Sequence, residues 1–311
     1  MICSRAPGKI ILFGEHFVVK GFPGIGLALD AYAKTCVEES EYTRVESKQL
    51  GVLYDERIGL GLESNIHALI NEIKRLGCAK SFRALIDSSI FISSGMGSSA
   101  AVAVSLAHSL LRFCGIDPSK ELVSKIAFEA EKIIHKRPSG IDNTLATYGG
   151  MIYYRAGEFK RIDFEWPREY SLLIVNTGIE RNTGVVVKDV LDLYERRKSI
   201  IHNIYVAAEK LVEEALSILR SGDMSTLGEL MNIAQGLLYT INVSCEKCEE
   251  LIWLLRRLGA LGAKVSGAGR GGIVIALFRN EEIHRAINAL SNTNTRYLIA
   301  SPDHTGVAEL A

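Results

Sequence analysis

The segment Gly95-Met96-Gly97-Ser98-Ser99-Ala100 stands before an apolar run of helical length and could bind an anion. If a helix starts here, the unpaired backbone N–H groups of its first turn and the positive end of its dipole converge on this loop. The glycines allow close backbone approach, and the Ser98 and Ser99 hydroxyls can serve phosphate oxygens or a magnesium ion. The plainer interpretation is a strand-to-helix turn with a serine cap.

Three other catalytic motifs fit the same loop less well. The pattern Gly95-x-Gly97-x-x-Ala100 matches a dinucleotide fingerprint, but the acidic residue about 20 positions later, Asp117, stands before a helix instead of after a strand. Residues 97–101 loosely resemble a hydrolase nucleophile elbow whose second glycine is missing. The common P-loop requires a lysine before the serines, and this loop has none.

A second glycine-rich loop, residues 265–272, lies between two predicted strands. Glycine at this density indicates positive φ angles or a backbone that approaches a ligand closely. Arg270 in its middle offers a cation to an anionic ligand. A wide hairpin loop is the alternative.

Four charged residues and a histidine complete the candidate chemistry. Lys9 begins an apolar strand, and Glu15 and His16 follow its end. Glu131 lies at the margin of the apolar stripe of a predicted helix, which suits a magnesium ligand or an ordinary boundary glutamate. Asp142 follows a Pro-Ser-Gly turn, which could hold its carboxylate against a site or form a plain Asx turn.

The elements that must position these residues alternate in the first half and are mostly helical in the second. Period-2 and 3.6-residue patterns separate them. They predict strands at 5–13, 24–29, 83–92, 151–154, 171–175, 263–266 and 273–278, and helices at 63–76, 98–114, 118–135, 186–197, 204–219, 226–238, 246–258 and 283–290. The order indicates an α+β protein of two domains, 1–166 and 167–311, divided at Pro167.

Composition and charge limit the classes of binding partner that are expected for this protein. Lys plus Arg equals Asp plus Glu at 36 each, and no block of like charge occurs, so nucleic acid is not expected. No apolar run approaches the roughly 18 residues of a membrane span, and the first residues lack a secretory h-region, so we expect a cytoplasmic protein without membrane contact. The six cysteines are expected to be reduced core thiols, and Cys245 and Cys248 lack partners for a zinc site.

In their order, the motifs resemble those of the GHMP kinase family. The matching segments are 7–16, 95–101 and 266–272, and the resemblance spans residues 7 to about 277. Within the family, segments 14–19, 138–143, 148–150, 176–177 and 181–183 are most similar to the members that phosphorylate mevalonate. Met96 replaces a usual leucine, the proline that often starts the second motif is missing, and Arg270 replaces a frequent glycine.

The resemblance implies an N-terminal ribosomal-protein-like α/β domain that binds ATP, a C-terminal ferredoxin-like domain, and an active site between them. It implies that Asp142 is the catalytic base and that Lys9 is its cationic neighbour. It also implies that Ser99 and Glu131 are Mg²⁺ ligands. It places ATP against the backbone of one set of residues and the acceptor against another. The ATP set is Gly95, Met96, Gly97, Ser98, Ser99, Ala100, Gly267 and Gly269, and the acceptor set is Glu15, His16, Arg181 and Thr183.

The implied activity is ATP-dependent phosphorylation of the 5-hydroxyl of (R)-mevalonate, a step of isoprenoid biosynthesis, by an enzyme that could be a homodimer. Two alternatives stay open at this stage. One is another small-molecule kinase of the family that acts on phosphomevalonate or on a different mevalonate hydroxyl, and Arg270 keeps it open as an additional cation. The other is a catalytically inactive nucleotide-binding sensor, against which intact Lys9, Glu131 and Asp142 argue.

Overall fold

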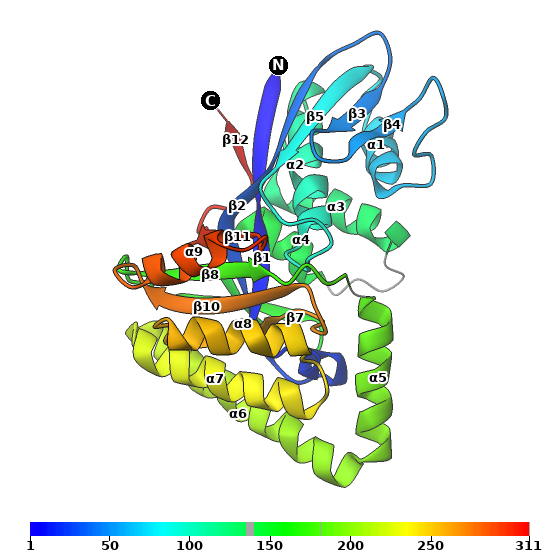
Figure 1. Cartoon of the computed structure of the whole chain (residues 1–311). Coiled ribbons are helices and arrows are strands. Elements are labelled where there is room, and N and C mark those ends of the chain that lie inside the picture. Colours follow the sequence, from blue (N-terminus) through cyan, green and yellow to red (C-terminus); the bar gives the residue numbers. More distant parts are fainter. Residues whose placement is uncertain (135–139, 181, 311) are drawn as a thin grey trace.

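Two β-sheets carry the fold, in a computed structural model that describes residues 1–134, 140–180 and 182–310 (Figure 1). In the described residues, the first sheet has the order β12-β1-β2-β5-β3-β4, and β6 pairs with both β2 and β7. Its strands are β1 (Ile2–Phe13), β2 (Gly24–Glu39), β3 (Arg44–Ser47), β4 (Gly51–Asp55), β5 (Phe82–Ser88), β6 (Met151–Arg155), β7 (Glu158–Ile162) and β12 (Ala308–Leu310). The second sheet, in the order β11-β8-β10-β9, is formed by β8 (Tyr170–Asn176), β9 (Gly262–Ser266), β10 (Ile273–Arg279) and β11 (Tyr297–Ala300).

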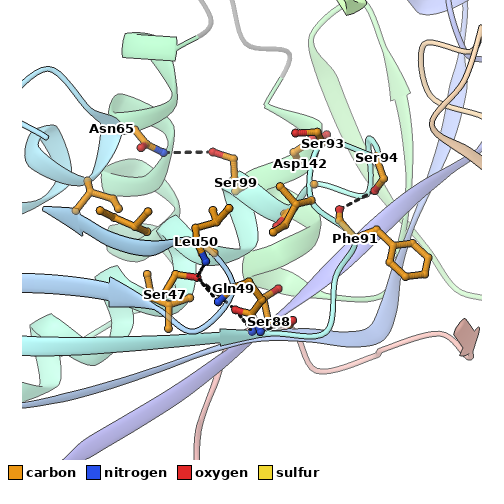
Figure 2. A pocket seen from close by; sticks show the side chains of 18 of the residues that line it. Ser47, Gln49, Leu50, Asn65, Ser88, Phe91, Ser93, Ser94, Ser99 and Asp142 are labelled. Atoms are coloured by element: carbon orange, nitrogen blue, oxygen red, sulfur yellow. Dashed lines mark hydrogen bonds between the residues drawn. The ribbon is translucent and has the colours of Figure 1, made fainter. Parts of the chain in front are cut away.

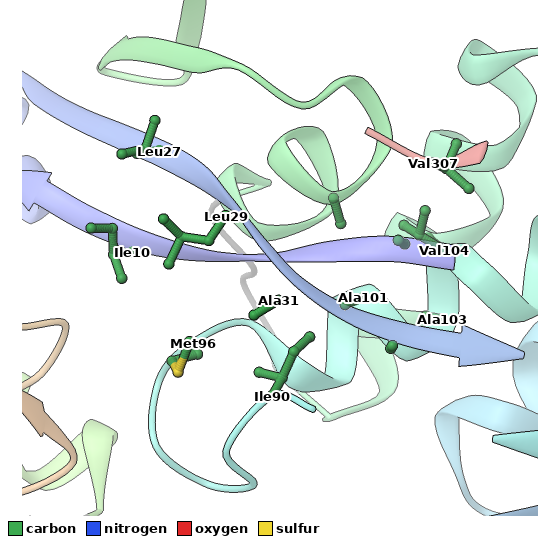
Figure 3. Packing of buried hydrophobic residues seen from close by; sticks show 14 of the residues in the cluster. Ile10, Leu27, Leu29, Ala31, Ile90, Met96, Ala101, Ala103, Val104 and Val307 are labelled. Atoms are coloured by element: carbon green, nitrogen blue, oxygen red, sulfur yellow. The ribbon is translucent and has the colours of Figure 1, made fainter. Parts of the chain in front are cut away.

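Helices of the first half cover the first sheet. The helix α2 (Ser98–Phe113) packs on β1 and β2, and its small and apolar residues are buried on nearly all sides, as the uninterrupted apolar run predicts. Figure 3 shows the contact, in which Ile10 and Leu29 of the sheet meet Ala101 and Met96. The other helices of this half are α1 (Asn65–Arg75), α3 (Lys120–Ile134) and α4 (Ile141–Tyr148), with a short 3-10 helix η1 (Phe17–Lys20) after β1.

The second sheet is buried on both faces. Successive residues of β8 alternate between two apolar cores: Leu172 and Ile174 join the core of the first sheet, and Leu173 and Val175 join a second core. Five helices complete this half of the molecule: α5 (Thr183–Arg196), α6 (Lys198–Ser221), α7 (Met224–Thr240), α8 (Glu246–Arg257) and α9 (Ile283–Ser291). No helix of the described part is long and apolar enough to cross a membrane.

The α+β assignment is confirmed, and the expected elements occur, but β2 runs to Glu39 instead of residue 29, and the strands β3, β4 and β7 were not expected. Two differences matter. The chain after the Pro-Ser-Gly segment is the helix α4 instead of a plain turn, and β12 returns to pair with β1, so the last residues join the first sheet. The division of the chain at Pro167 stays a prediction, and the predicted end of the helix 118–135 lies outside the described residues.

The expectation of six reduced cysteines is wrong for this structure. It pairs Cys3 with Cys36, Cys78 with Cys114, and Cys245 with Cys248. Cys3 and Cys36 face each other across β1 and β2, with Cα atoms 4.0 Å apart. Sequence spacing alone could not reveal this pairing, because it depends on the register of two strands.

Candidate active site

The glycine loop before α2 is attached to β1. The backbone N–H of Lys9 donates to the Met96 carbonyl at 2.8 Å, and the Met96 side chain is fully buried in the core beneath (Figure 3). Gly97 has a left-handed φ of 71°, and a Cβ atom there would lie 3.0 Å from Lys9 Cγ. Backbone angle and space therefore both require glycine. The loop brings the unpaired first-turn N–H groups of α2 next to Lys9.

Asp142 meets Lys9 at the same place. It lies in the first turn of α4, which starts after Gly140 (φ 78°), and its Oδ1 atom is 3.0 Å from Lys9 Nζ. The Lys9 side chain is 9% exposed and that of Asp142 is 29% exposed, so the carboxylate is open on one side. A carboxylate held by an ammonium group in this way is oriented to receive a proton from a bound hydroxyl.

Two cavities meet at this carboxylate. The first, of about 540 Å³, is lined by Ser98, Ser99, Ala100 and Glu131, and Figure 2 shows its interior. The second, of about 350 Å³, is lined by Lys9, Glu15, His16, Gly267 and apolar side chains. Three residues line both cavities: Gly95, Asp142 and Thr183. A group bound in one cavity can therefore react with a group bound in the other beside Asp142.

Glu131 and Ser99 fit a cation in the first cavity. The Glu131 Oε2 atom is buried without a hydrogen-bond partner. Burial, together with the nearby charge of Asp142, raises the pKa of Glu131 to about 7. A divalent cation would remove this cost, because it supplies the positive charge that the carboxylate lacks. Within the described part of the chain no group of three or more His, Cys, Asp or Glu side chains could hold a metal, so these oxygens would share it with the nucleotide phosphates.

Asn65 supports Ser99, and sequence analysis missed it. Its side-chain amide donates to Ser99 Oγ at 3.2 Å, as drawn in Figure 2. Asn65 is the first residue of α1, a helix capped by Ser64, whose hydroxyl accepts from the His67 N–H. An asparagine at a helix start looks like part of a cap, so the sequence carries no signal for this contact.

The predicted acceptor residues Glu15 and His16 line the second cavity, but their polar groups already contact the second glycine-rich loop, residues 265–272, and the strand β9 before it. Glu15 forms a buried ion pair with Lys264 of β9, and His16 Nε2 is 2.9 Å from the Ala268 carbonyl. Burial raises the pKa of Glu15 and lowers that of Lys264, since each charged form loses hydration, and their mutual attraction opposes both changes. Lys264 was missed because a lysine in a short strand normally points to solvent.

The remaining predicted residues divide into three groups. Thr183 lines both cavities, whereas Arg181 lies outside the described residues. Gly267 lines the second cavity, and Gly269 packs where a Cβ atom would lie 2.2 Å from the Val243 carbonyl, so the ATP contact expected of these two stays a prediction. Arg270 does not point toward an anion site in this structure: its Nη1 lies 2.6 Å from Asp189 Oδ2.

Comparison with known proteins agrees with this geometry. The family model "GHMP kinases N terminal domain" matches residues 64–150, and "GHMP kinases C terminal" matches residues 211–295. The chain belongs to the GHMP kinase family, and it has the kinase fold of that family.

Relatives named mevalonate kinase cover most of this chain. A mevalonate kinase of Aeropyrum pernix is 36% identical over 308 residues, which cover 96% of this chain and 95% of that protein. A mevalonate kinase of Pyrococcus horikoshii is 33% identical, with 92% of each chain covered. Among solved structures, L. major mevalonate kinase in complex with R-mevalonate superimposes with a TM-score of 0.83 at 31% identity, covering 97% of this chain and 96% of that one.

Proposed function

We propose that this protein transfers the γ-phosphoryl group of ATP to the 5-hydroxyl of (R)-mevalonate, giving 5-phosphomevalonate and ADP in the mevalonate route of isoprenoid biosynthesis. One observation carries the proposal: the Asp142 carboxylate, paired with Lys9 at 3.0 Å, lies where a cavity beside a phosphate-binding loop meets a smaller cavity. The relatives named mevalonate kinase supply the acceptor.

The reaction follows from this placement. Asp142 accepts the proton of the acceptor hydroxyl while the hydroxyl oxygen forms a bond to the γ-phosphorus of ATP. The bond between that phosphorus and the β–γ bridging oxygen breaks, and ADP leaves with the electron pair. Lys9 stabilises the negative charge that develops on the acceptor oxygen, and the first-turn N–H groups of α2 stabilise the charge on the phosphoryl oxygens. Mg²⁺, held by Ser99 and Glu131, would neutralise the charge of the β- and γ-phosphates.

The second cavity suits a small acid with an apolar middle. Its walls are mostly apolar, with Ile25, Ile141 and Val187 among them, and its charged and polar side chains are those of Lys9, Glu15, His16, Asp142, Tyr154 and Thr183. Arg181, Thr183 and His16, which the family resemblance assigns to the acceptor, are the candidates for its carboxylate. Glu15 is assigned a supporting role, because its carboxylate is already paired with Lys264.

The other hypotheses lose support. Phosphomevalonate requires a further cation, and the Arg270 guanidinium, which was the candidate, is paired with Asp189. The ion pair of Lys9 with Asp142 supports an active enzyme over a nucleotide sensor. The homodimer and the cytoplasmic location stay predictions from the sequence.

One assay tests the proposal. ADP release is measured for the purified protein with mevalonate, phosphomevalonate, homoserine and galactose, and the product is identified by ³¹P and ¹H NMR. We expect turnover with mevalonate and a phosphate ester at its 5-position. A higher kcat/KM with phosphomevalonate, or a phosphate on another hydroxyl, would contradict the proposal.

A further inference from the structure

The first turn of α5 forms part of the acceptor cavity and is mostly exposed, although Val186 directly after it is buried. Thr183 lines both cavities and Val187 lines the second. Residues 182–185 are all exposed, and the helix stands at the right-hand edge of the molecule before it meets α6 (Figure 1). The other end of α5 is held separately, because Lys20 pairs with Glu195 at 2.5 Å. Packing of Val186 and Val190 holds one face of the helix, and polar contacts from the neighbouring loop add to this packing.

The second glycine-rich loop, residues 265–272, forms hydrogen bonds with the chain that leads into α5. The N–H and the hydroxyl of Thr177 both donate to the Gly272 carbonyl, at 2.8 and 3.0 Å. The Gly272 N–H donates in return to the Ile179 carbonyl at 3.1 Å. These bonds fix the connection on the side of β8, several residues before the helix.

Arg270 of the same loop reaches the helix itself. Its Nη1 donates to Asp189 Oδ2 at 2.6 Å, and its Nε donates to the Asn242 carbonyl at 2.9 Å. Its backbone N–H donates to the Val243 carbonyl at 2.6 Å. The guanidinium group is therefore aimed at α5 by two carbonyl groups, and its bond to Asp189 is charge-assisted. The loop therefore contacts the segment 177–189 at two points, residue 179 and residue 189.

We propose that Arg270 is a positioning residue for the acceptor: it ties α5 to the second glycine-rich loop through Asp189 and so fixes Thr183 and Val187 on the acceptor cavity. Arg270 has a φ of 52°, a backbone angle that favours glycine, so its side chain is present despite a backbone cost. The role concerns acceptor binding, since Arg270 lies on neither cavity lining among the described residues. The inference rests on the proposed function for the identity of the acceptor.

Steady-state kinetics separates this role from a catalytic one. Arg270→Gly and Asp189→Asn should each raise the KM for mevalonate about two- to fivefold, because the ion pair is partly exposed to solvent, with kcat and the KM for ATP within twofold. The double variant should lose no more than the worse single variant, because both remove the same bond. Arg270→Lys should recover part of the loss. Asp192→Asn is the matched control, since it removes the Lys188–Asp192 pair within α5 and should leave the KM unchanged.

Hydrogen exchange supplies a second measurement that needs no substrate. Amides of residues 184–190 should exchange faster in Arg270→Gly than in the wild type or in Asp192→Asn. A fall in kcat at constant mevalonate KM would overturn the inference and place Arg270 near the transferred phosphoryl group. Unchanged exchange in α5 would also overturn it. If the wild type does not use mevalonate, the proposed function fails, and the exchange experiment still decides whether Arg270 holds α5.

Discussion

Titration of Glu131 gives a sharp test of the cation site. Its pKa is raised to about 7 by burial and by the charge of Asp142, so the carboxylate changes its charge within the working range of the protein. Only the ionised form can bind a cation. With a pKa of about 7, roughly one molecule in eleven is ionised at pH 6 and ten in eleven at pH 8. The benefit of Mg²⁺ should therefore rise about tenfold between these pH values, about fivefold from pH 6 to pH 7 and about twofold from pH 7 to pH 8.

The assay is nucleotide binding, so it does not depend on turnover. The Kd of a non-hydrolysable ATP analogue is measured with excess Mg²⁺ and with a chelator, from pH 6 to pH 8, and the ratio of the two values reports what the metal contributes. The phosphates of the analogue also change protonation in this pH range, so the Glu131→Gln variant is measured as the reference at each pH. The Kd ratio of this variant should be smaller than that of the wild type, and its pH dependence should reflect only the protonation of the analogue. Ser99→Ala removes a neutral ligand and should lower the ratio less, with the pH dependence kept.

A further variant tests the cause of the raised pKa. Asp142→Asn removes the neighbouring negative charge, which should move the midpoint of the pH dependence to lower pH. The reasoning is refuted if the wild type and Glu131→Gln show the same pH dependence, because Glu131 would then be an ordinary boundary glutamate.

The same titration acts on the stability of the metal-free protein. A carboxyl whose pKa is raised from 4.5 to about 7 binds its proton more tightly in the folded state. Its contribution therefore favours folding below pH 4.5 and is lost as the pH rises from 4.5 to about 7. The metal-free wild type should lose stability relative to Glu131→Gln across that window, as thermal unfolding would show.

Three other predictions follow from the site. Asp142→Asn should lower kcat by about 10² to 10⁴ with little change in nucleotide Kd, and a variant that keeps more than about a third of kcat would show that Asp142 is not the base. Lys264→Met should cost about 3 to 5 kcal/mol in urea unfolding because it leaves the Glu15 charge buried and unpaired; the addition of Glu15→Gln should restore most of that loss, and no restoration would argue against the pair. Gly97→Ala should cost at least about 1 kcal/mol and reduce kcat, since its φ is 71° and the new Cβ meets Lys9; wild-type kcat would show that the loop tolerates a side chain.

Local patterns were enough to predict most of the elements and the helix that follows the first glycine loop. The apolar run after Gly97 indicates a buried helix, which the structure contains as α2, and the anion site at its start stays a prediction. The family motifs pointed to Lys9, Asp142, Ser99 and Glu131 as site residues, because the order of these motifs along the chain identifies the family. These features depend on neighbours within a few residues or on motif order, and both can be read from one sequence.

Contacts between distant segments could not be read in this way. Lys264 looks like a surface lysine until β9 is placed against the end of β1, where its ammonium group pairs with Glu15 and also donates to the Val265 carbonyl. Arg270 looks like a cation for a ligand until α5 brings Asp189 within 2.6 Å. The pairing of Cys3 with Cys36 follows from the register of β1 on β2. In each case the chemistry of a residue depends on which partner the fold brings within hydrogen-bond or covalent distance, and that partner lies tens to hundreds of residues away in the chain.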